Sequence, residues 1–188
     1  MTISQAIQNR KAVYPPLYND KPIPKEIINE ILENANRAPT HRLTEPWRFK
    51  VIRGKGKARF ADFLAEKYKD STIDDNFSER KHLKLQENPR KADTIIVIVM
   101  KRDSLERVPE WEEVAAVAMA VQNMWLTATA HEIGSYWSSP SLIEFMDEFI
   151  SMEPSEKCLG FFYMGYYDDD VSPSKRTPIE EKTSWIES

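Results

Sequence analysis

The strongest constraint on the fold is a continuous apolar run at residues 94–100. It reads Thr-Ile-Ile-Val-Ile-Val-Met and is β-branched at every position except the last. A strand with one face in water alternates apolar and polar residues, whereas a continuous β-branched run is typical of a central strand covered on both faces. We therefore expect this run to form the core of a sheet with further layers packed against it.

Helices and strands alternate along the rest of the chain. Apolar residues at helical spacing predict helices, and the alternation in 47–52 predicts a half-buried strand. The expected helices cover about residues 2–10, 25–37, 57–69, 110–131 and 141–149, and the expected strands 47–52, 94–100, 135–137 and 157–166. A chain of 188 residues is long enough for one substantial domain but short for two independent cores. We expect one α+β domain over residues 1–188, a three-layer α/β/α sandwich.

Three segments carry further information about packing. The helix at 110–131 is apolar around most of its circumference, which predicts burial on nearly all sides. Residues 70–90 are rich in charge and predict an exposed, partly helical and mobile flap. The tail at 171–188 is polar but carries Ile179 and Trp185, so we expect it to dock, either on its own domain or by wrapping around a partner subunit. The apolar helix and the apolar residues of the tail together give more hydrophobic surface than one small core readily covers, which favours burial between two subunits of a homodimer.

Composition excludes several classes of function. The net charge is -4 and 41% of residues are hydrophobic, so we expect no nucleic-acid partner. The longest apolar runs are too short to cross a bilayer and the N-terminus lacks a signal-type core, which predicts a cytoplasmic protein with no membrane partner. The single cysteine, Cys158, lies among apolar residues and predicts a packed thiol. The spacing of the three histidines argues against a zinc site, and no glycine-rich nucleotide motif is present.

Three basic or polar islands lie at the ends of expected elements. They are Asn9-Arg10-Lys11, Arg37 with His41, and Lys175-Arg176. Taken singly, each is more typical of a solvated charge or a helix end than of a ligand contact. Their order along the chain is more informative than any one of them.

The segment from Arg37 to Phe49 reads RAPTHRLTEPWRF and resembles the APSxxNxQPW segment of the nitroreductase family. The N-terminal island is similar to the RRS motif of that family. Further matches occur in the family's order: the helix entry before Arg37, the central helix at 120–126, the loop at 134–140, the closing strand at 159–166 and the tail at 176–181. The resemblance covers most of the chain and is weakest at 65–90. The RAPxHxxxxPW form and the short chain resemble the compact branch of minimal nitroreductases.

This resemblance implies a nitroreductase-like fold with a central mixed sheet, a long buried central helix and a C-terminal extension exchanged in a homodimer. It also implies FMN at the subunit interface, NADH or NADPH as electron donor, and ping-pong hydride transfer through the flavin N5 to a nitroaromatic, quinone or similar acceptor. No catalytic side chain is implied. The cofactor-binding residues implied are Arg10, Lys11, Ala12, Arg37, His41, Trp137, Ser138, Ser139, Lys175 and Arg176.

Within this set the roles differ. Arg10, Lys11 and Arg176 are candidates for the flavin phosphate, because a dianionic phosphate needs several convergent cations. Arg37 and His41 approach the flavin from the partner subunit in the resembling branch. Residues 137–139 are expected to place backbone groups and hydroxyls near the flavin ring or ribityl chain.

Three positions depart from the family pattern. The serine of RRS is Ala12, the usual asparagine is Leu43 and the usual glutamine is Glu45. They weaken the expected grip on the phosphate and motivate an alternative, a flavin-binding or flavin-delivery protein of the same fold with little turnover. A third hypothesis, a nonenzymatic partner-binding module, depends only on the charged segment at 70–90.

Overall fold

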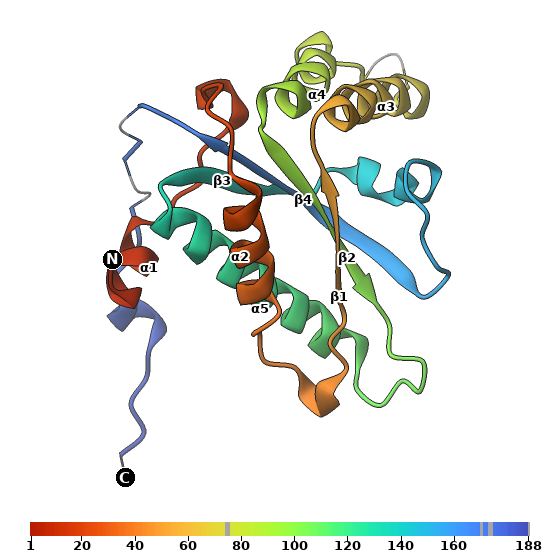
Figure 1. The fold of residues 1–188 in the computed structure, drawn as a ribbon. Helices are drawn as coiled ribbons and strands as arrows, with labels where there is room; N and C mark the ends of the chain where they lie inside the picture. Colours follow the sequence, from red (N-terminus) through yellow and green to blue (C-terminus); the bar gives the residue numbers. More distant parts are fainter. Residues whose placement is uncertain (74–75, 170, 173–174, 188) are drawn as a thin grey trace.

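The computed structural model describes residues 1–73, 76–169, 171–172 and 175–187. Positions 74–75 of the expected flap and 173–174 and 188 of the expected tail lie outside the described residues, as does position 170. The α-helices are α1 (Ile3–Asn9), α2 (Lys25–Ala35), α3 (Lys55–Ser71), α4 (Glu79–Lys91) and α5 (Glu110–Ala130) (Figure 1). The strands are β1 (Trp47–Ile52), β2 (Thr94–Lys101), β3 (Ile133–Ser138) and β4 (Glu156–Tyr166). The 3-10 helices are η1 (Pro15–Leu17), η2 (His41–Leu43), η4 (Ser141–Glu148) and η5 (Ile179–Lys182). No helix in these residues is long and apolar enough to span a membrane.

The strands form one sheet in the order β1-β2-β4-β3. Residues 95–99 of β2 are completely buried, which confirms the central strand predicted from its β-branched run. The resemblance implied a mixed sheet, but all four strands pair antiparallel, and the described residues pair in parallel only at an isolated bridge between Ala12 and Ser135. Helices α3 and α4 connect β1 to β2 and bring the chain back to the end of the sheet where β1 ends. Strand β2 therefore begins beside Ile52 and runs antiparallel to β1.

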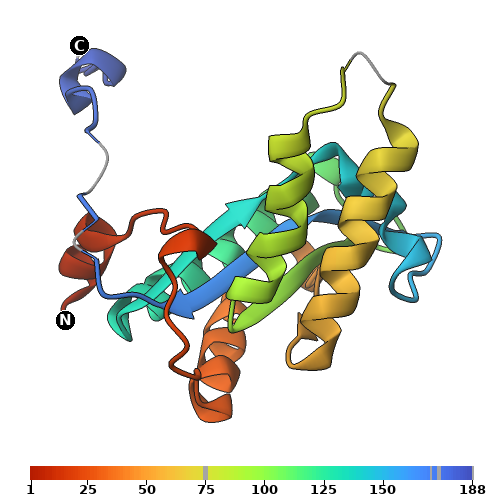
Figure 2. The ribbon, with the colours of Figure 1, turned by 90° about the horizontal axis from the view of Figure 1, so that it is seen from above.

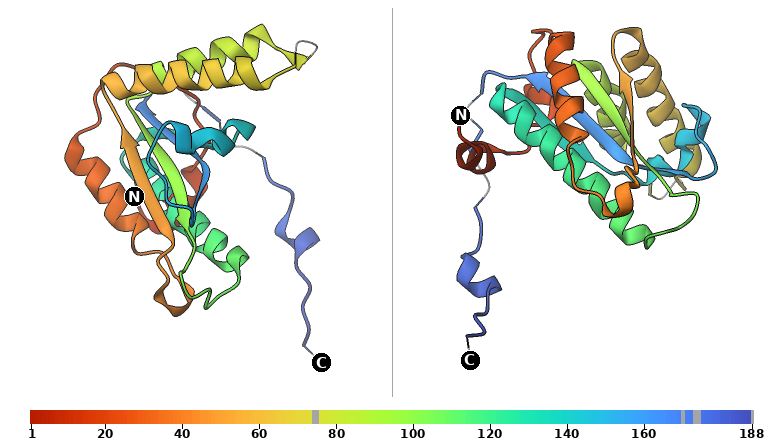
Figure 3. Two further views of the ribbon diagram at one scale, coloured as in Figure 1. Left: turned by 90° about the vertical axis from the view of Figure 1, so that its right-hand side faces the viewer. Right: turned by 60° about the horizontal axis from the view of Figure 1, so that its bottom comes forward.

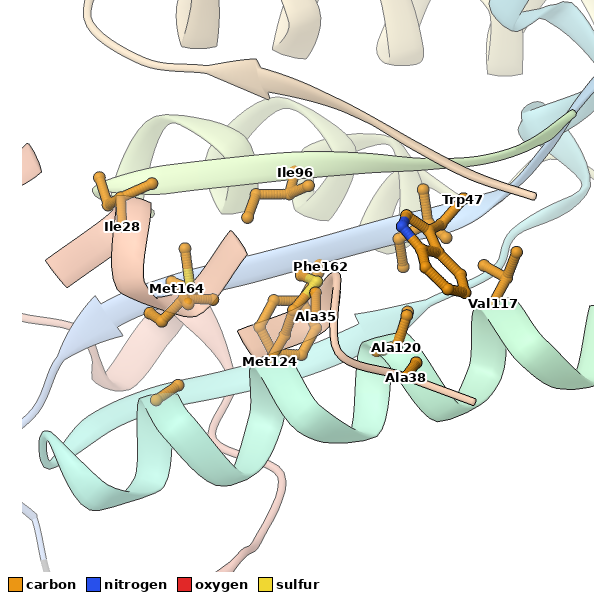
Figure 4. Packing of buried hydrophobic residues seen from close by; sticks show 14 of the residues in the cluster. Ile28, Ala35, Ala38, Trp47, Ile96, Val117, Ala120, Met124, Phe162 and Met164 are labelled. Carbon is orange, nitrogen blue, oxygen red and sulfur yellow. The ribbon is translucent and has the colours of Figure 1, made fainter. Parts of the chain in front are cut away.

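Helices cover both faces of the sheet and make three layers. Alternate residues of β2 point to opposite faces, so Ile96 and Ile98 pack with α2 and α5, while Ile95 and Val97 pack with α3 and η4. In Figure 1, α2 and α5 lie in front of the sheet, and α3 and α4 lie at the top of the view. Figure 4 shows Met124 of α5 beside Phe162 of β4 within the first of these two cores. The three-layer α+β sandwich is confirmed.

Local sequence signals explain where helices begin. Thr2 caps α1 through a capping box with Gln5, and the Ser78 side chain accepts a hydrogen bond from the Lys81 backbone N–H at the start of α4. Proline precedes both α2 and α5, at Pro24 and Pro109, where its fixed φ suits the entry to a helix.

The central helix α5 is buried along one face only in a single chain. Ala120, Met124 and Ala128 are completely buried, but Trp111 is 69% exposed and Met119 40% exposed. The prediction of burial on nearly all sides therefore holds for half of the helix. The reason is that α2 and the sheet cover one side of α5, and helical spacing cannot show which apolar residues receive a neighbour.

The charged segment at 70–90 is largely helical. It comprises the end of α3 and most of α4, and these two helices lie side by side in antiparallel directions (Figure 2). Phe77 stacks on Tyr68 with ring centroids 5.4 Å apart, and the Ser78 N–H donates to the Tyr68 hydroxyl at 2.9 Å. These contacts hold residues 77–78 against α3.

The tail leaves the body of the molecule. Residues 175–187 extend away from the sheet and its helices, as Figure 3 shows, and include the short helix η5. Ile179, Trp185 and Ile186 are all more than half exposed. In a single chain residues 175–187 therefore lie away from the sheet and its helices.

Candidate functional site

The Arg10–Ala12 turn connects α1 to the edge of the sheet. The guanidinium carbon of Arg10 lies 4.7 Å from the centre of the Trp125 ring on α5, and the indole N–H of Trp125 donates to the Lys11 carbonyl at 3.2 Å. Ala12 forms the bridge to Ser135 of β3, where the Val13 N–H donates to the Ser135 carbonyl at 3.1 Å. Three of the predicted cofactor residues are therefore held against β3 and α5.

Two glycines allow the chain after this turn to lie close on the sheet. A Cβ added at Gly134 would stand 2.9 Å from Val13 Cγ1, and one added at Gly165 would stand 2.6 Å from the Tyr18 ring. Real Cβ atoms essentially never approach other atoms this closely. Any larger residue at these two positions would lift residues 13–18 away from β3 and β4, and the cationic turn with them.

The far end of β3 holds the second group of predicted residues. Trp137 is half-buried and its indole N–H donates to the Leu159 carbonyl at 3.1 Å. The ring lies across Gly160, whose φ of +139° and missing side chain leave the room it needs. Ser138 is half-buried and Ser139 exposed.

The outer edge of β3 offers backbone hydrogen-bonding groups. Ser135 turns its carbonyl outward to Val13, and because this direction alternates along a strand, Trp137 turns its N–H and C=O to the same edge. In the described residues no strand or bridge pairs with this edge beyond Ser135. A planar molecule with donors and acceptors along its rim could bind here.

An unsatisfied hydroxyl lies beside Ala12. The Oγ of Ser135 is buried and has no hydrogen-bond partner within the described chain. Leaving a buried polar group unpaired costs about 1–3 kcal/mol. Native proteins seldom keep such groups without a reason, so this hydroxyl marks the junction of the turn and the strand as unusual.

The other predicted cations are not assembled around this edge. The Lys11 ammonium donates to the Val171 carbonyl and lies 5.8 Å from the centre of the Tyr167 ring, so it faces the start of the tail. Lys175 and Arg176 are exposed in the tail itself, where an Arg176 N–H donates to the Lys175 carbonyl at 3.1 Å. A single chain therefore presents Arg10, Lys11 and Arg176 as separate groups.

Arg37 and His41 line hollows against α5. Arg37 is exposed and lines a shallow hollow of about 230 Å³ together with Leu126. His41 Nδ1 lies 2.6 Å from Glu112 Oε2, at a second, largely apolar hollow of about 420 Å³. The residues of the second hollow are Pro39, Thr40, His41, Trp111, Glu112, Ala115, Ala116 and Met119.

The loop between His41 and β1 is strained and held by polar contacts. Arg42, Leu43 and Glu45 all have positive φ, which is rare for such side chains and costs on the order of 1–3 kcal/mol each. The Thr40 hydroxyl accepts from the Glu45 N–H at 3.2 Å, and Arg48 donates to the Glu45 carbonyl at 2.8 Å. The Leu43 side chain, which replaces the family's asparagine, is 78% exposed.

Sequence reasoning missed two aromatic residues beside the predicted site. Trp125 contacts both Arg10 and Lys11, but its sequence signal is only that of a core residue on an apolar helix. Tyr136 stacks on Tyr163 with ring centroids 5.0 Å apart; burial raises the pKa of its hydroxyl, and hydrogen bonding with Ser138 and Asn88 opposes that rise. Both roles arise from contacts between distant segments.

Two negative expectations concern metals and the thiol. In the described ranges no group of three or more metal-binding side chains occurs. Cys158 is buried, as predicted, and burial raises the pKa of its thiol to about 11. This thiol is a protonated, packed group at neutral pH.

Comparison with known proteins gives a consistent set of relatives. The model of the family described as "Nitroreductase family" matches residues 7–166. An Escherichia coli (strain K12) protein named "Putative NAD(P)H nitroreductase YdjA" is 32% identical over 155 residues, which cover 81% of this chain and 82% of the relative. A nitroreductase-like family protein from Bacillus cereus has a crystal structure with a TM-score of 0.82 and 27% identity, over 100% of this chain and 97% of that one.

A further structural neighbour carries a ligand. The crystal structure of a protein from Desulfovibrio desulfuricans, described as a "putative nitroreductase in complex with FMN", has a TM-score of 0.76 and 24% identity, over 100% of this chain and 98% of that chain. At this identity the likeness shows the same fold.

Proposed function

The chain belongs to the nitroreductase family, and from this premise we propose that it is an FMN-dependent NAD(P)H oxidoreductase that reduces nitroaromatic, quinone or similar acceptors. Bound FMN would supply the redox chemistry, taking a hydride from NADH or NADPH and passing it to the acceptor in a ping-pong cycle. The observation that carries the proposal is the junction of the Arg10–Ala12 turn with the edge of β3 at Ser135.

The residues at this junction fit the two ends of FMN. The phosphate carries about -1.5 to -2 charges at pH 7, and Arg10 offers a planar set of donors for it. The isoalloxazine rim carries donors and acceptors, which match the outward N–H and C=O of Trp137 and the hydroxyl of Ser138. The unpartnered Ser135 hydroxyl lies between these two ends.

The protein would bind and orient the flavin rather than supply an acid. Trp137 is locked by its hydrogen bond to Leu159 and by contact with Gly160, so the backbone edge beside it is rigid. The Tyr136 hydroxyl is protonated at neutral pH, where burial raises its pKa still further, and it can donate a hydrogen bond beside Ser138. The Lys11 ammonium has three donors and uses one of them on the Val171 carbonyl, so it can also donate to a phosphate.

We also propose that a homodimer completes the site. The exposed apolar residues of α5, Trp111 and Met119, and those of the tail, Trp185 and Ile186, fit a self-complementary interface. Arg37 and His41 line hollows on α5 and would face the flavin of the second subunit. A monomer at micromolar concentration in sedimentation velocity would contradict this part of the proposal.

An absorbance experiment tests the oxidoreductase proposal. The purified protein is saturated with FMN, and its spectrum is recorded anaerobically before and after addition of NADPH or NADH. We expect the protein-bound flavin to absorb at about 450 nm, the usual flavin band, and at least one donor to bleach this absorbance rapidly. Protein that takes up no FMN would refute the proposal. FMN that binds but is not bleached would favour the flavin-binding or flavin-delivery alternative.

A charge-matched pair of variants localises the site. Arg10→Ala removes a cation at the proposed phosphate end, whereas Arg59→Ala removes one from an exposed position on α3. We expect weaker FMN binding in the first variant and unchanged binding in the second. Equal loss in both would show that overall charge, rather than this junction, controls flavin affinity.

A further inference from the structure

One tryptophan touches two successive residues of the cationic turn. We infer that Trp125 is a positioning residue for the flavin phosphate, which presents the Arg10 guanidinium and fixes the backbone at Lys11, and so makes the protein select FMN over flavins that lack a phosphate. This inference deepens the proposed function and depends on it. The following geometry supports it.

The protein core packs against the Trp125 ring. The ring packs edge-on against Phe162 of β4, with centroids 5.7 Å apart and an interplanar angle of 76°. Phe162 is completely buried between the sheet and α5. Trp125 is itself half-buried, so the core fixes the ring while leaving surface for Arg10.

The contact between Arg10 and Trp125 leaves the guanidinium able to bind an anion. The guanidinium carbon lies 4.7 Å from the ring centre, within the range of a cation–π interaction. A guanidinium that lies over an aromatic ring contacts the ring through the planar face of the guanidinium, and its N–H groups point outward in that plane. The N–H fork is the part that binds a phosphate in a bidentate manner, so the contact with Trp125 orients Arg10 without occupying its donors.

The indole N–H acts on the next residue. It donates to the Lys11 carbonyl at 3.2 Å, which fixes the backbone just before Ala12 pairs with Ser135. The turn is therefore fastened at both ends, by Trp125 on α5 and by the β3 bridge. A free arginine side chain must lose rotamer freedom when it binds a phosphate, and this arrangement removes part of that loss beforehand.

A purely structural role predicts a different result. If Trp125 only fills space, its loss would loosen the whole site and weaken FMN and riboflavin alike. If it positions Arg10, its loss would weaken FMN alone, because riboflavin has the same ring and ribityl chain but no phosphate. The ratio of the two dissociation constants separates these roles.

The test compares FMN and riboflavin binding to the apoprotein by quenching of flavin fluorescence. The variants are Trp125→Leu, Trp125→Phe, Arg10→Ala and the double variant Arg10→Ala/Trp125→Leu, with Trp47→Phe as control. Trp47 is buried on β1 and its indole N–H donates to Asn36 Oδ1 at 2.9 Å, away from Arg10. Trp125→Phe keeps an aromatic face but loses the N–H, so it gives an answer even if Trp125→Leu fails to fold.

We expect Trp125→Leu to weaken FMN binding roughly three- to tenfold, since a partly exposed cation–π contact corresponds to a roughly two- to fivefold effect and lost preorganisation adds to it. Trp125→Phe should lose roughly two- to threefold on the same basis. Riboflavin binding should be unchanged in both, and Trp125→Leu should weaken FMN binding less in the Arg10→Ala background than in the wild type, because only the contact with Lys11 is left to lose.

Equal weakening of FMN and riboflavin by Trp125→Phe, or an additive effect in the double variant, would overturn the inference. A wild-type protein that binds both flavins equally well would overturn it too, but would leave the proposed function standing. A wild-type protein that binds neither flavin would overturn the proposed function itself.

Discussion

Replacing Gly160 by alanine should destabilise the protein through the contact between β4 and the end of β3. The added Cβ would stand 2.5 Å from the Ser138 carbonyl oxygen and nearer still to Trp137 Nε1. Neither neighbour can yield easily, because the first is backbone and the second is held by its hydrogen bond to Leu159. The φ of +139° is also a conformation that side chains rarely adopt.

The magnitude follows from three separate costs. The backbone conformation costs about 1–3 kcal/mol and the forced overlap about 1–3 kcal/mol, and loss of the Trp137 hydrogen bond adds about 0.5–1.5 kcal/mol. We expect the free energy of unfolding to fall by about 2.5–7.5 kcal/mol, a large share of the ~5–15 kcal/mol of a typical domain. For a chain of this size that corresponds to a melting temperature lower by roughly 5–30 °C.

Two other glycines separate the contributions. Gly54 has a φ of +53° but no heavy atom within 4 Å of an added Cβ, so Gly54→Ala imposes the backbone cost without the overlap. Gly56, in the first turn of α3, would meet only Ile52 Cγ2 at 3.2 Å. Urea unfolding followed by far-UV circular dichroism should rank the losses as Gly160→Ala, then Gly54→Ala, then Gly56→Ala. A Gly160→Ala midpoint equal to that of Gly54→Ala would refute the argument that Trp137 and Ser138 are immovable.

Three further predictions concern other parts of the molecule. Because burial raises the pKa of the Cys158 thiol to about 11, the native protein should react with a disulfide reagent at pH 8 far more slowly than the urea-unfolded protein, and equal rates would contradict the packing described. Glu113 is buried at the start of α5, where it pairs with Arg102 and accepts from the Asp103 N–H at 2.9 Å, so Glu113→Ala should lower the free energy of unfolding by about 1.5–3 kcal/mol while exposed Glu110→Ala changes it little. Truncation after Ser172 should weaken self-association in sedimentation velocity without changing the far-UV spectrum of the body, and an unchanged sedimentation coefficient would show that the tail has no part in assembly.

Elements defined by local pattern could be predicted from the sequence. The β-branched run of β2 is buried on both faces as expected, and α2 and α5 lie close to their predicted bounds. The exposed face of α5 could not be predicted, because Trp111 and Val117 both count as apolar in the helical pattern and only the tertiary packing shows that Val117 is buried and Trp111 is not. The antiparallel arrangement also depends on which strands become neighbours, which no local pattern encodes.

The candidate site shows the same division. The cationic turn could be predicted because Asn9-Arg10-Lys11 resembles the family's RRS motif. The contact of Trp125 with that turn joins residues more than a hundred positions apart. The contact of the Trp137 ring with Gly160 depends on the register of β3 against β4. Such roles have no local signal beyond the residue type, so they become visible only when the strands and helices are in place.

Folding of one chain and assembly of two would therefore build different halves of the proposed site. The turn at Arg10–Ala12, the β3 edge and Trp125 are fixed by contacts within one chain. Arg37 and His41 lie on an incompletely covered side of α5, and Lys175 and Arg176 lie in a tail that leaves the body. A ligand that binds the assembled form more tightly than the separate chains must shift the equilibrium toward assembly. On the proposed dimer, FMN affinity should rise with protein concentration, and FMN should in turn raise the sedimentation coefficient at low protein concentration.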